Sequence, residues 1–209
     1  MPVRISDCTA EDAPGLAAVL YADWLDPDPW TKLCYGAVDA HEQLVHLEAV
    51  IREDLTDPEY PVAFQKARDD DTAEIVGFTQ LTHLNTPANE RGQVAPIPKP
   101  AGYNVPPIRD YYAKMSTARK RVMGDDPFLR KHLPFYLTEM YIKKPYQRHG
   151  LGTSLMAWAT EYAASKKLPI YAEASEAGEA FYKHLGWKTV GTYSVDMGLY
   201  GASPQRASS

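Results

Sequence analysis

A glycine-containing turn between a predicted strand and a predicted helix constrains the fold of this 209-residue chain most. Residues 135–142 are rich in aromatic and β-forming side chains, which predicts a central strand. Residues 150–166 carry an apolar stripe at helical spacing, which predicts a helix. The turn between them reads Gln147-Arg148-His149-Gly150-Leu151-Gly152-Thr153. The chemistry of this turn is therefore the first thing to settle.

The turn allows two interpretations. A helix N-terminus presents unpaired N–H groups, and glycines let that backbone approach a ligand, so the turn could cradle a pyrophosphate with Arg148 and Thr153 as added donors. Alternatively, the glycines only ease close packing between strand and helix. A Walker loop is absent, and Leu155 stands where a dinucleotide fingerprint needs a third Gly or Ala.

The remaining elements predict an α/β (α+β) fold with a partly parallel sheet flanked by helices. Strands are expected at residues 3–6, 62–67, 74–82, 168–174 and 187–193. Helices are expected after Thr9, from near Asp39, at residues 108–122, and after Ser175 up to Gly186. The helix at 108–122 has a basic face, interpreted as solvated or else as attractive to phosphates or an acidic partner; its members are Arg109, Lys114, Arg119, Lys120 and Arg121.

Composition excludes several classes of function. The net charge of 22 − 27 = −5 makes a general nucleic-acid binder a poor candidate. Two cysteines, Cys8 and Cys34, suit reduced thiols in a cytoplasmic protein. No run of residues is long and apolar enough for a membrane span, and residues 1–7 lack the apolar stretch of a signal peptide.

No metal site is expected. His41 and His46 are five residues apart, so their imidazoles point about 140° apart on a helix and do not share a metal. The turn at residues 69–72 is interpreted as solvated, because it lacks the further oxygen ligands of a calcium loop.

Residues 136–152 resemble motif A of the GNAT superfamily of acyl-CoA-dependent N-acetyltransferases. The family pattern Arg/Gln-x-x-Gly-x-Gly/Ala is matched by Gln147, Gly150 and Gly152. Residues 173–187 are similar to the family's closing motif, with Trp187 where Phe is usual. The resemblance implies the GNAT fold, in which a mixed central sheet splays open at the motif-A strand.

The resemblance also implies where acetyl-CoA, or another acyl-CoA, would bind as co-substrate. Its pantetheine arm would pair with the open edge of the motif-A strand, and its pyrophosphate would sit on the N–H groups of the turn. The residues so assigned are Met140, Tyr141, Ile142, Gln147, Arg148, His149, Gly150, Leu151, Gly152 and Thr153. Ser175 stands where many members carry a cofactor-binding Asn.

Three residues are candidates for proton transfer. An attacking amine must lose a proton, which Glu139 or Glu173 could take. The alternative for either carboxylate is a structural pair with a cation or a backbone donor. The closing-motif tyrosine, often the acid that protonates the leaving thiolate, is Tyr182; its alternative is packing of the last helix. A backbone N–H near residues 140–142 would stabilise the developing oxyanion.

The expected function is therefore transfer of an acetyl group from acetyl-CoA to a primary amine of a small molecule, by direct attack. The alternatives are a GNAT-like protein that binds CoA or another ligand without activity, and a scaffold diverted to other chemistry. Neither nucleic acid nor membrane is an expected partner. Residues 1–209 are expected to form one domain with a loose tail from about residue 202.

An insertion at about residues 85–133 interrupts the expected domain. Six of the 17 prolines fall in residues 85–107, where regular structure is not expected. The insertion is expected to lie over the acceptor side, with Tyr103, Tyr111 and Tyr112 as wall residues, or else to form the contact of a homodimer.

Overall fold

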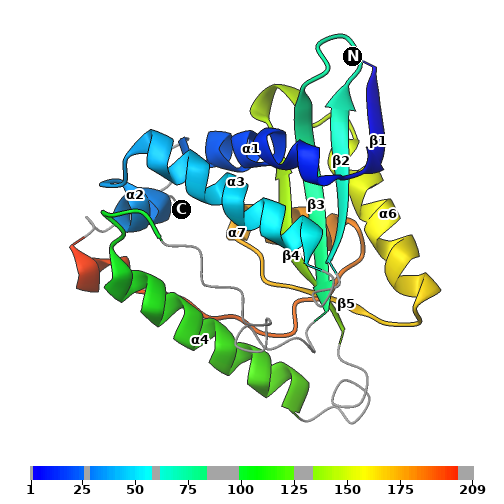
Figure 1. The fold of residues 1–209 in the computed structure, drawn as a ribbon. Coiled ribbons are helices and arrows are strands. Elements are labelled where there is room, and N and C mark those ends of the chain that lie inside the picture. Colours follow the sequence, from blue (N-terminus) through cyan, green and yellow to red (C-terminus); the bar gives the residue numbers. More distant parts are fainter. Residues whose placement is uncertain (1, 26–28, 58–61, 84–98, 125–133, 202–209) are drawn as a thin grey trace.

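The computed structural model describes residues 2–25, 29–57, 62–83, 99–124 and 134–201. Within these ranges, one mixed sheet lies between helices on its two faces (Figure 1). Its strands follow chain order: β1 (Val3–Asp7), β2 (Val62–Asp69), β3 (Ile75–His83), β4 (Phe135–Ile142) and β5 (Ile170–Ala172). β1 to β4 pair antiparallel, whereas β4 and β5 pair parallel. The predicted mixed, partly parallel sheet is confirmed.

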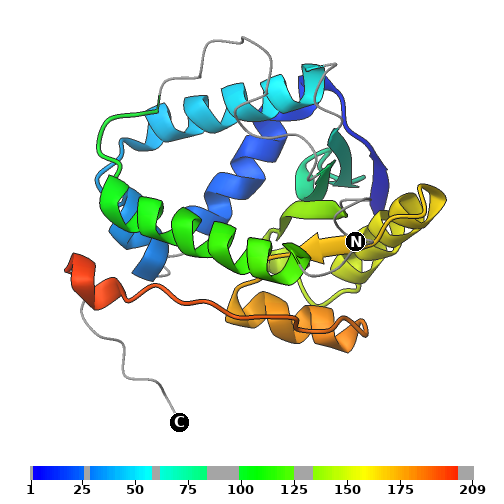
Figure 2. The same ribbon diagram turned by 90° about the horizontal axis from the view of Figure 1, so that it is seen from below.

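The helices form two layers because their apolar stripes pack on opposite faces of the sheet. α1 (Ala13–Leu25) and α3 (Ala40–Thr56) cover one face, and α6 (Leu151–Ser165) and α7 (Glu176–His184) lie on the other (Figures 1 and 2). In the first layer, Leu16, Leu47 and Ile51 pack with Phe78 of β3. In the second, Met156 and Ala159 pack with Leu81 and Leu137.

Side-chain caps fix where two of these helices begin. The Asp39 carboxylate accepts hydrogen bonds of 3.0 Å from the N–H groups of His41 and Glu42. The Ser175 hydroxyl accepts from the N–H of Gly178 at 3.2 Å. Gly186, at φ +86°, follows the end of α7. The helix starts and the stop predicted from these residues are therefore confirmed.

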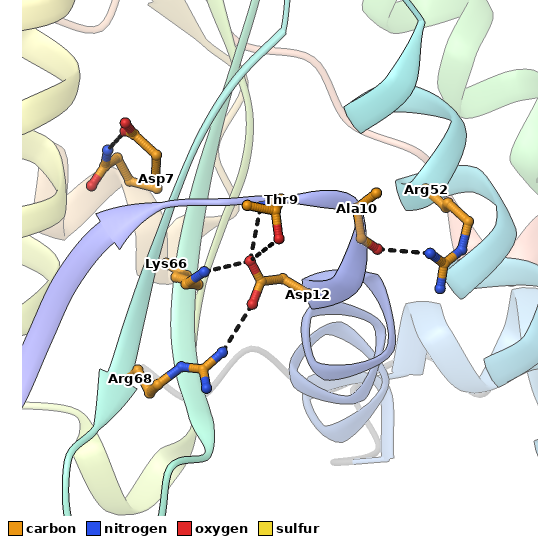
Figure 3. Close-up of polar contacts among 8 residues, drawn as sticks. Asp7, Thr9, Ala10, Asp12, Arg52, Lys66 and Arg68 are labelled. Atoms are coloured by element: carbon orange, nitrogen blue, oxygen red, sulfur yellow. Dashed lines mark hydrogen bonds and ion pairs between the residues drawn. The ribbon is translucent and has the colours of Figure 1, made fainter.

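One buried carboxylate ties the first layer to the sheet (Figure 3). Asp12 ends the short 3₁₀ turn η1 (Ala10–Asp12) and receives the Lys66 ammonium and, at 2.9 Å, the Arg68 guanidinium, both from β2. The same carboxylate accepts from the Thr9 N–H at 2.8 Å. Asp12 and Lys66 are both buried. Nothing in the sequence pattern pointed to this cluster.

Two local expectations were wrong. The expected strand at 187–193 is irregular chain that runs beside α4 (Val105–Gly124), as Figures 1 and 2 show. A Cβ at Gly191 would lie 3.5 Å from side-chain atoms of Arg121 and Val122, so this segment packs on a helix and has no strand partner. Asp69 is not solvated but 3% exposed, because the Tyr146 hydroxyl donates to it at 2.6 Å.

Two helices differ from expectation near prolines. α2 (Pro29–Tyr35) was not predicted, although its proline occupies the first helical position, where no N–H is needed. α4 begins at Val105, three residues earlier than expected, since Pro106 and Pro107 fit the first turn of a helix. The expectation of irregular structure through residue 107 was therefore wrong for these three positions.

Parts of the predicted insertion and tail, namely residues 84–98, 125–133 and 202–209, lie outside the described residues. Among the helices that are described, none has the length and apolar character needed to cross a membrane.

Candidate active site

The edge of β4 that faces β5 is open over its C-terminal half. Gln80 pairs with Glu139, and Leu81 pairs with Leu137, so Thr138 is an extra residue that bulges from β4. β5 pairs only with residues 135–137 of β4. Beyond the bulge, the described residues 139–142 pair with β3 alone. A bulge bends its strand, and here it accompanies the splay that the resemblance implied.

The two faces of β4 carry different groups. Met140 packs with the α6 layer, and Ile142 packs with Leu151 at the start of α6. Glu139 is the register partner of Gln80, whose amide donates to Asp54 of α3 at 3.0 Å. Because paired residues project to the same face, Glu139 points toward the α1–α3 layer. Glu139 therefore lies opposite to Met140 and Ile142, as alternation predicts.

The turn before α6 exposes the start of the helix. The Gln147 amide donates to the Ile142 carbonyl at 2.8 Å, which holds the turn against the end of β4. Arg148, at φ +65°, and Gly150, at φ +80°, take left-handed backbone conformations. Residues 147–150 are exposed, and a Cβ at Gly150 would meet nothing within 4 Å. The first N–H groups of α6 therefore face accessible space.

The second glycine of the turn has a different role. A Cβ at Gly152 would lie 3.2 Å from Cζ of Phe181 and 3.3 Å from Cδ1 of Ile142. Gly152 therefore allows α6 to pack closely on β4 and α7, which is the second interpretation of the turn. The two interpretations apply to different glycines, since Gly150 is open. An acyl-CoA pyrophosphate fits this geometry, because open N–H groups at a helix N-terminus are an anion site.

Tyr182 of α7 packs on the α6 side of the sheet. Its ring centroid lies 5.3 Å from that of Phe181 and 5.2 Å from that of Trp187. Burial, with a further contribution from the negative charge of Glu139, raises the pKa of Tyr182 to about 12. Tyr182 and Glu139 therefore interact electrostatically although they come from opposite layers.

Glu173 has several donors. Its side chain is 4% exposed and accepts from the Arg119 guanidinium at 3.0 and 2.7 Å. The hydroxyls of Tyr136 and Tyr171 also donate hydrogen bonds to Glu173. Burial, and next the negative charge of Glu173, raise the pKa of both tyrosines, that of Tyr171 to about 12. Glu173 thus has the cation partner that was the structural alternative for it.

Arg119 corrects the interpretation of the basic helix face. The guanidinium carbon lies 4.5 Å from the centroid of the Tyr136 ring, in addition to the two bonds with Glu173. The expectation that Arg119 belongs to a solvated face was wrong, because its side chain turns inward to β4 and to the segment after β5. Arg109, Lys120 and Arg121 are exposed, as expected. A basic residue with an acidic partner 54 positions away gives no local sequence signal.

The three predicted wall tyrosines gather around α2. Tyr103 packs its ring on Tyr35 at 5.1 Å and on His46 at 6.2 Å. Tyr111 and Tyr112 are on α4, with ring centroids 5.4 Å apart. Burial, then the charges of Tyr111 and Glu139, raise the pKa of Tyr112. Tyr103 also contributes to the raised pKa of Tyr112, so these two residues lie near each other.

The Ser175 hydroxyl is occupied by the cap of α7, as described above. Thr153 is exposed in the first turn of α6. Within the described part of the chain, no three or more His, Cys, Asp and Glu side chains gather in a group that could hold a metal.

Comparison with known proteins agrees with this geometry. Residues 118–189 match the family model described as an acetyltransferase (GNAT) domain. The fold is similar to that of a GCN5-related N-acetyltransferase from Ralstonia eutropha, at 12% identity and TM-score 0.55, covering 94% of this chain and 99% of that one. No curated protein matches the sequence.

Two further solved structures carry ligand or substrate names. A predicted acetyltransferase from Clostridium acetobutylicum, solved with acetyl-CoA, is 12% identical with TM-score 0.55, covering 94% and 97% of the two chains. An aminoglycoside 6′-N-acetyltransferase from Acinetobacter baumannii is 12% identical with TM-score 0.52, covering 93% and 97%. The resemblance to the GNAT superfamily is confirmed: the chain has the fold of these acetyltransferases, which supports acyl transfer in general.

Proposed function

We propose that this protein transfers an acetyl group from acetyl-CoA to the primary amine of a small molecule by direct attack. The observation that carries the proposal is the open edge of β4 next to the exposed turn that starts α6. Glu139 lies on this strand, and its charge contributes to the raised pKa of Tyr182. A base and an acid from opposite layers would meet where the strands separate. The solved structure with acetyl-CoA and the aminoglycoside acetyltransferase have the same fold and support both substrate classes.

Residues of the turn and of β4 would hold the co-substrate. The N–H groups of Leu151, Gly152 and Thr153 would bind the pyrophosphate, because they start α6 and lack helical acceptors. The open edge at residues 139–142 would pair with the pantetheine amides. Bound acetyl-CoA supplies an activated acetyl thioester. Exposed Arg148 and His149 lie beside this anion site.

Two side chains would move the protons. Glu139 would accept the proton of the amine as its nitrogen bonds to the acetyl carbon, and Tyr182 would donate its proton to the departing sulfur. At neutral pH Tyr182 retains its proton, because burial and the Glu139 charge raise its pKa. When Glu139 becomes protonated, that charge is lost and the Tyr182 hydroxyl becomes a stronger acid. The two transfers would therefore assist each other.

We favour Glu139 over Glu173 as the base. Glu173 accepts two bonds from Arg119 as well as the hydroxyls of Tyr136 and Tyr171, which suits a structural carboxylate. Glu139 lies on the part of β4 that pairs with β3 alone. Glu173 would instead position the insertion helix. In this proposal, residues 1–209 form one domain, and the insertion at about 85–133 lines the acceptor side.

Thiol release with acetyl-CoA and a panel of primary amines tests the function. We expect release with at least one amine, and a loss of release in both Glu139→Gln and Tyr182→Phe. Tight CoA binding without release from any amine would favour the binding-protein alternative. Calorimetric titration of CoA separates the two cases, since it reports binding without chemistry.

A further inference from the structure

Four aromatic side chains form a connected group beside the proposed acceptor side. We call this group the aromatic cluster; its members are Trp30 of α2, Tyr111 and Tyr112 of α4, and Tyr193 of the C-terminal segment. The Tyr111 ring lies at its centre, 5.3 Å from Trp30, 5.4 Å from Tyr112 and 5.8 Å from Tyr193. Rings from two other parts of the chain, α2 and the C-terminal segment, contact Tyr111 in addition to its helix neighbour Tyr112, so the Tyr111 ring is fixed by packing.

Tyr112 is the accessible member of the aromatic cluster. It leaves 54% of its surface exposed, although burial and neighbouring groups raise its pKa. Protein therefore surrounds the ring while a ligand can still reach it. An exposed ring backed by a fixed ring is a stacking surface, because the ligand need not order it first.

The position of Tyr112 on α4 directs it toward the sheet. Arg119 follows Tyr112 by seven residues, which is about two helical turns and about 10 Å along the axis. Residues at this spacing project from the same side of a helix. Arg119 reaches Glu173 and the Tyr136 ring, so this side of α4 faces β4 and β5. Tyr112 therefore faces the same layer as Glu139, whose charge it senses.

We infer that the aromatic cluster is the acceptor subsite, and that it takes a primary amine carried on an aromatic ring. The ligand ring stacks on Tyr112, and its amine extends toward Glu139. This inference rests on the proposed function only for the direction in which the amine points; the stacking surface itself does not depend on catalysis. It also narrows the acceptor from any small amine to one class.

The test is calorimetric binding of two probes, phenethylamine and putrescine, to the full-length protein in the presence of CoA. We expect phenethylamine to bind more tightly. Tyr112→Ala should raise its dissociation constant roughly fivefold to tenfold, the equivalent of one lost aromatic contact. Tyr112→Phe should retain binding, because the ring face remains. Thr117→Ala, on the exposed side of the same helix, is the control and should change nothing.

Each other outcome has one meaning. Equal or tighter binding of putrescine, or unchanged phenethylamine binding in Tyr112→Ala, would overturn the inference. Selective, Tyr112-dependent binding without thiol release from any amine would uphold the subsite while the proposed function fails. Conversely, acetylation of putrescine that ignores Tyr112 would support the function and remove the subsite. Circular dichroism of each variant shows that it is folded.

Discussion

Tyr182 is held in the protonated form by its surroundings, and at the residue scale this makes it the clearest test of the proposed chemistry. We expect Tyr182→Phe to lower kcat by about 100- to 10,000-fold, the range for loss of a positioned acid. The phenyl ring preserves the packing on Phe181 and Trp187. The CoA dissociation constant should therefore not change. An unaltered kcat would remove Tyr182 from the mechanism while leaving the enzyme.

The interaction between Glu139 and Tyr182 has a consequence that does not depend on activity. Glu139→Gln removes a negative charge that raises the pKa of Tyr182, so that pKa should fall below about 12 while burial keeps it above its ordinary value. Nuclear magnetic resonance of ring-labelled tyrosine, assigned with Tyr182→Phe, measures this shift. A Tyr182 pKa that stays the same would mean that the Glu139 charge does not act on Tyr182.

At the scale of elements, the two glycines of the turn before α6 have different roles, since Gly152 allows close packing and Gly150 leaves the helix start open. Gly152→Ala should destabilise the protein by about 1–3 kcal/mol, because the new Cβ overpacks Phe181 and Ile142. Gly150→Ala should cost about 1–2 kcal/mol from its left-handed backbone and should also weaken CoA binding, because the turn relaxes. Urea unfolding and CoA titration measure both. Identical effects of the two variants on both readouts would contradict the division of roles.

In the first layer, Asp12 with Thr9, Lys66 and Arg68 forms a polar group, the Asp12 cluster, which ties the helices to the sheet. Asp12→Asn should cost about 3–5 kcal/mol, because it leaves the buried Lys66 ammonium without its partner. Burial opposes ionisation of Asp12, but hydrogen bonds from Lys66 and Thr9 and the Lys66 charge outweigh it and lower the pKa.

The sign of the pH dependence follows from that direction. Since the folded pKa of Asp12 lies below its unfolded value, the cluster contributes its full stability above the unfolded pKa of about 3.9, and that contribution is lost as pH falls through the folded pKa. As pH falls from 7 to acidic values, the free energy of unfolding, measured with urea, should therefore decrease less in Asp12→Asn than in the parent protein. The double variant Asp12→Asn/Lys66→Met should recover part of the loss, because it removes the unpaired charge.

At the scale of the whole molecule, sequence patterns predicted those features that depend on residues close together in the chain. The β4–turn–α6 unit and the caps at Asp39 and Ser175 follow from periodicity and short-range bonding. The strand expected at 187–193 failed, because strand formation needs a partner, and this segment packs beside α4. The packing of residues 187–193 on α4 could not be predicted from sequence periodicity, because periodicity reflects only residues that are close in the chain.

In the candidate site, too, contiguous motifs could be predicted from the sequence, whereas contacts between distant residues could not. Glu139, Tyr182 and the turn were identified from motifs, since each motif is contiguous. The bulge at Thr138, the pairing of Arg119 with Glu173 and the aromatic cluster join residues far apart in the chain. No spacing rule encodes such contacts. The insertion is where this matters most, because its helix is placed by those contacts.

The attachment of α4 to the rest of the molecule gives the last prediction. Arg119 and Glu173 tie the insertion helix to the segment after β5, and both side chains are largely buried. Glu173→Gln should destabilise the protein by about 3–5 kcal/mol, because the Arg119 charge loses its partner. In the folded protein, Tyr112 should lose its position relative to Glu139, which raises the KM for the amine more than it lowers kcat.

The CoA dissociation constant should stay unchanged, because the turn before α6 contacts neither partner of the ion pair. Arg119→Met provides the matched variant, and the double variant Arg119→Met/Glu173→Gln should be more stable than either single one, since no unpaired charge remains. Steady-state kinetics with an acetylated amine and urea unfolding measure these effects. If Glu173 were instead the base, Glu173→Gln would lower kcat at unchanged KM, and the double variant would not restore activity even where it restores stability.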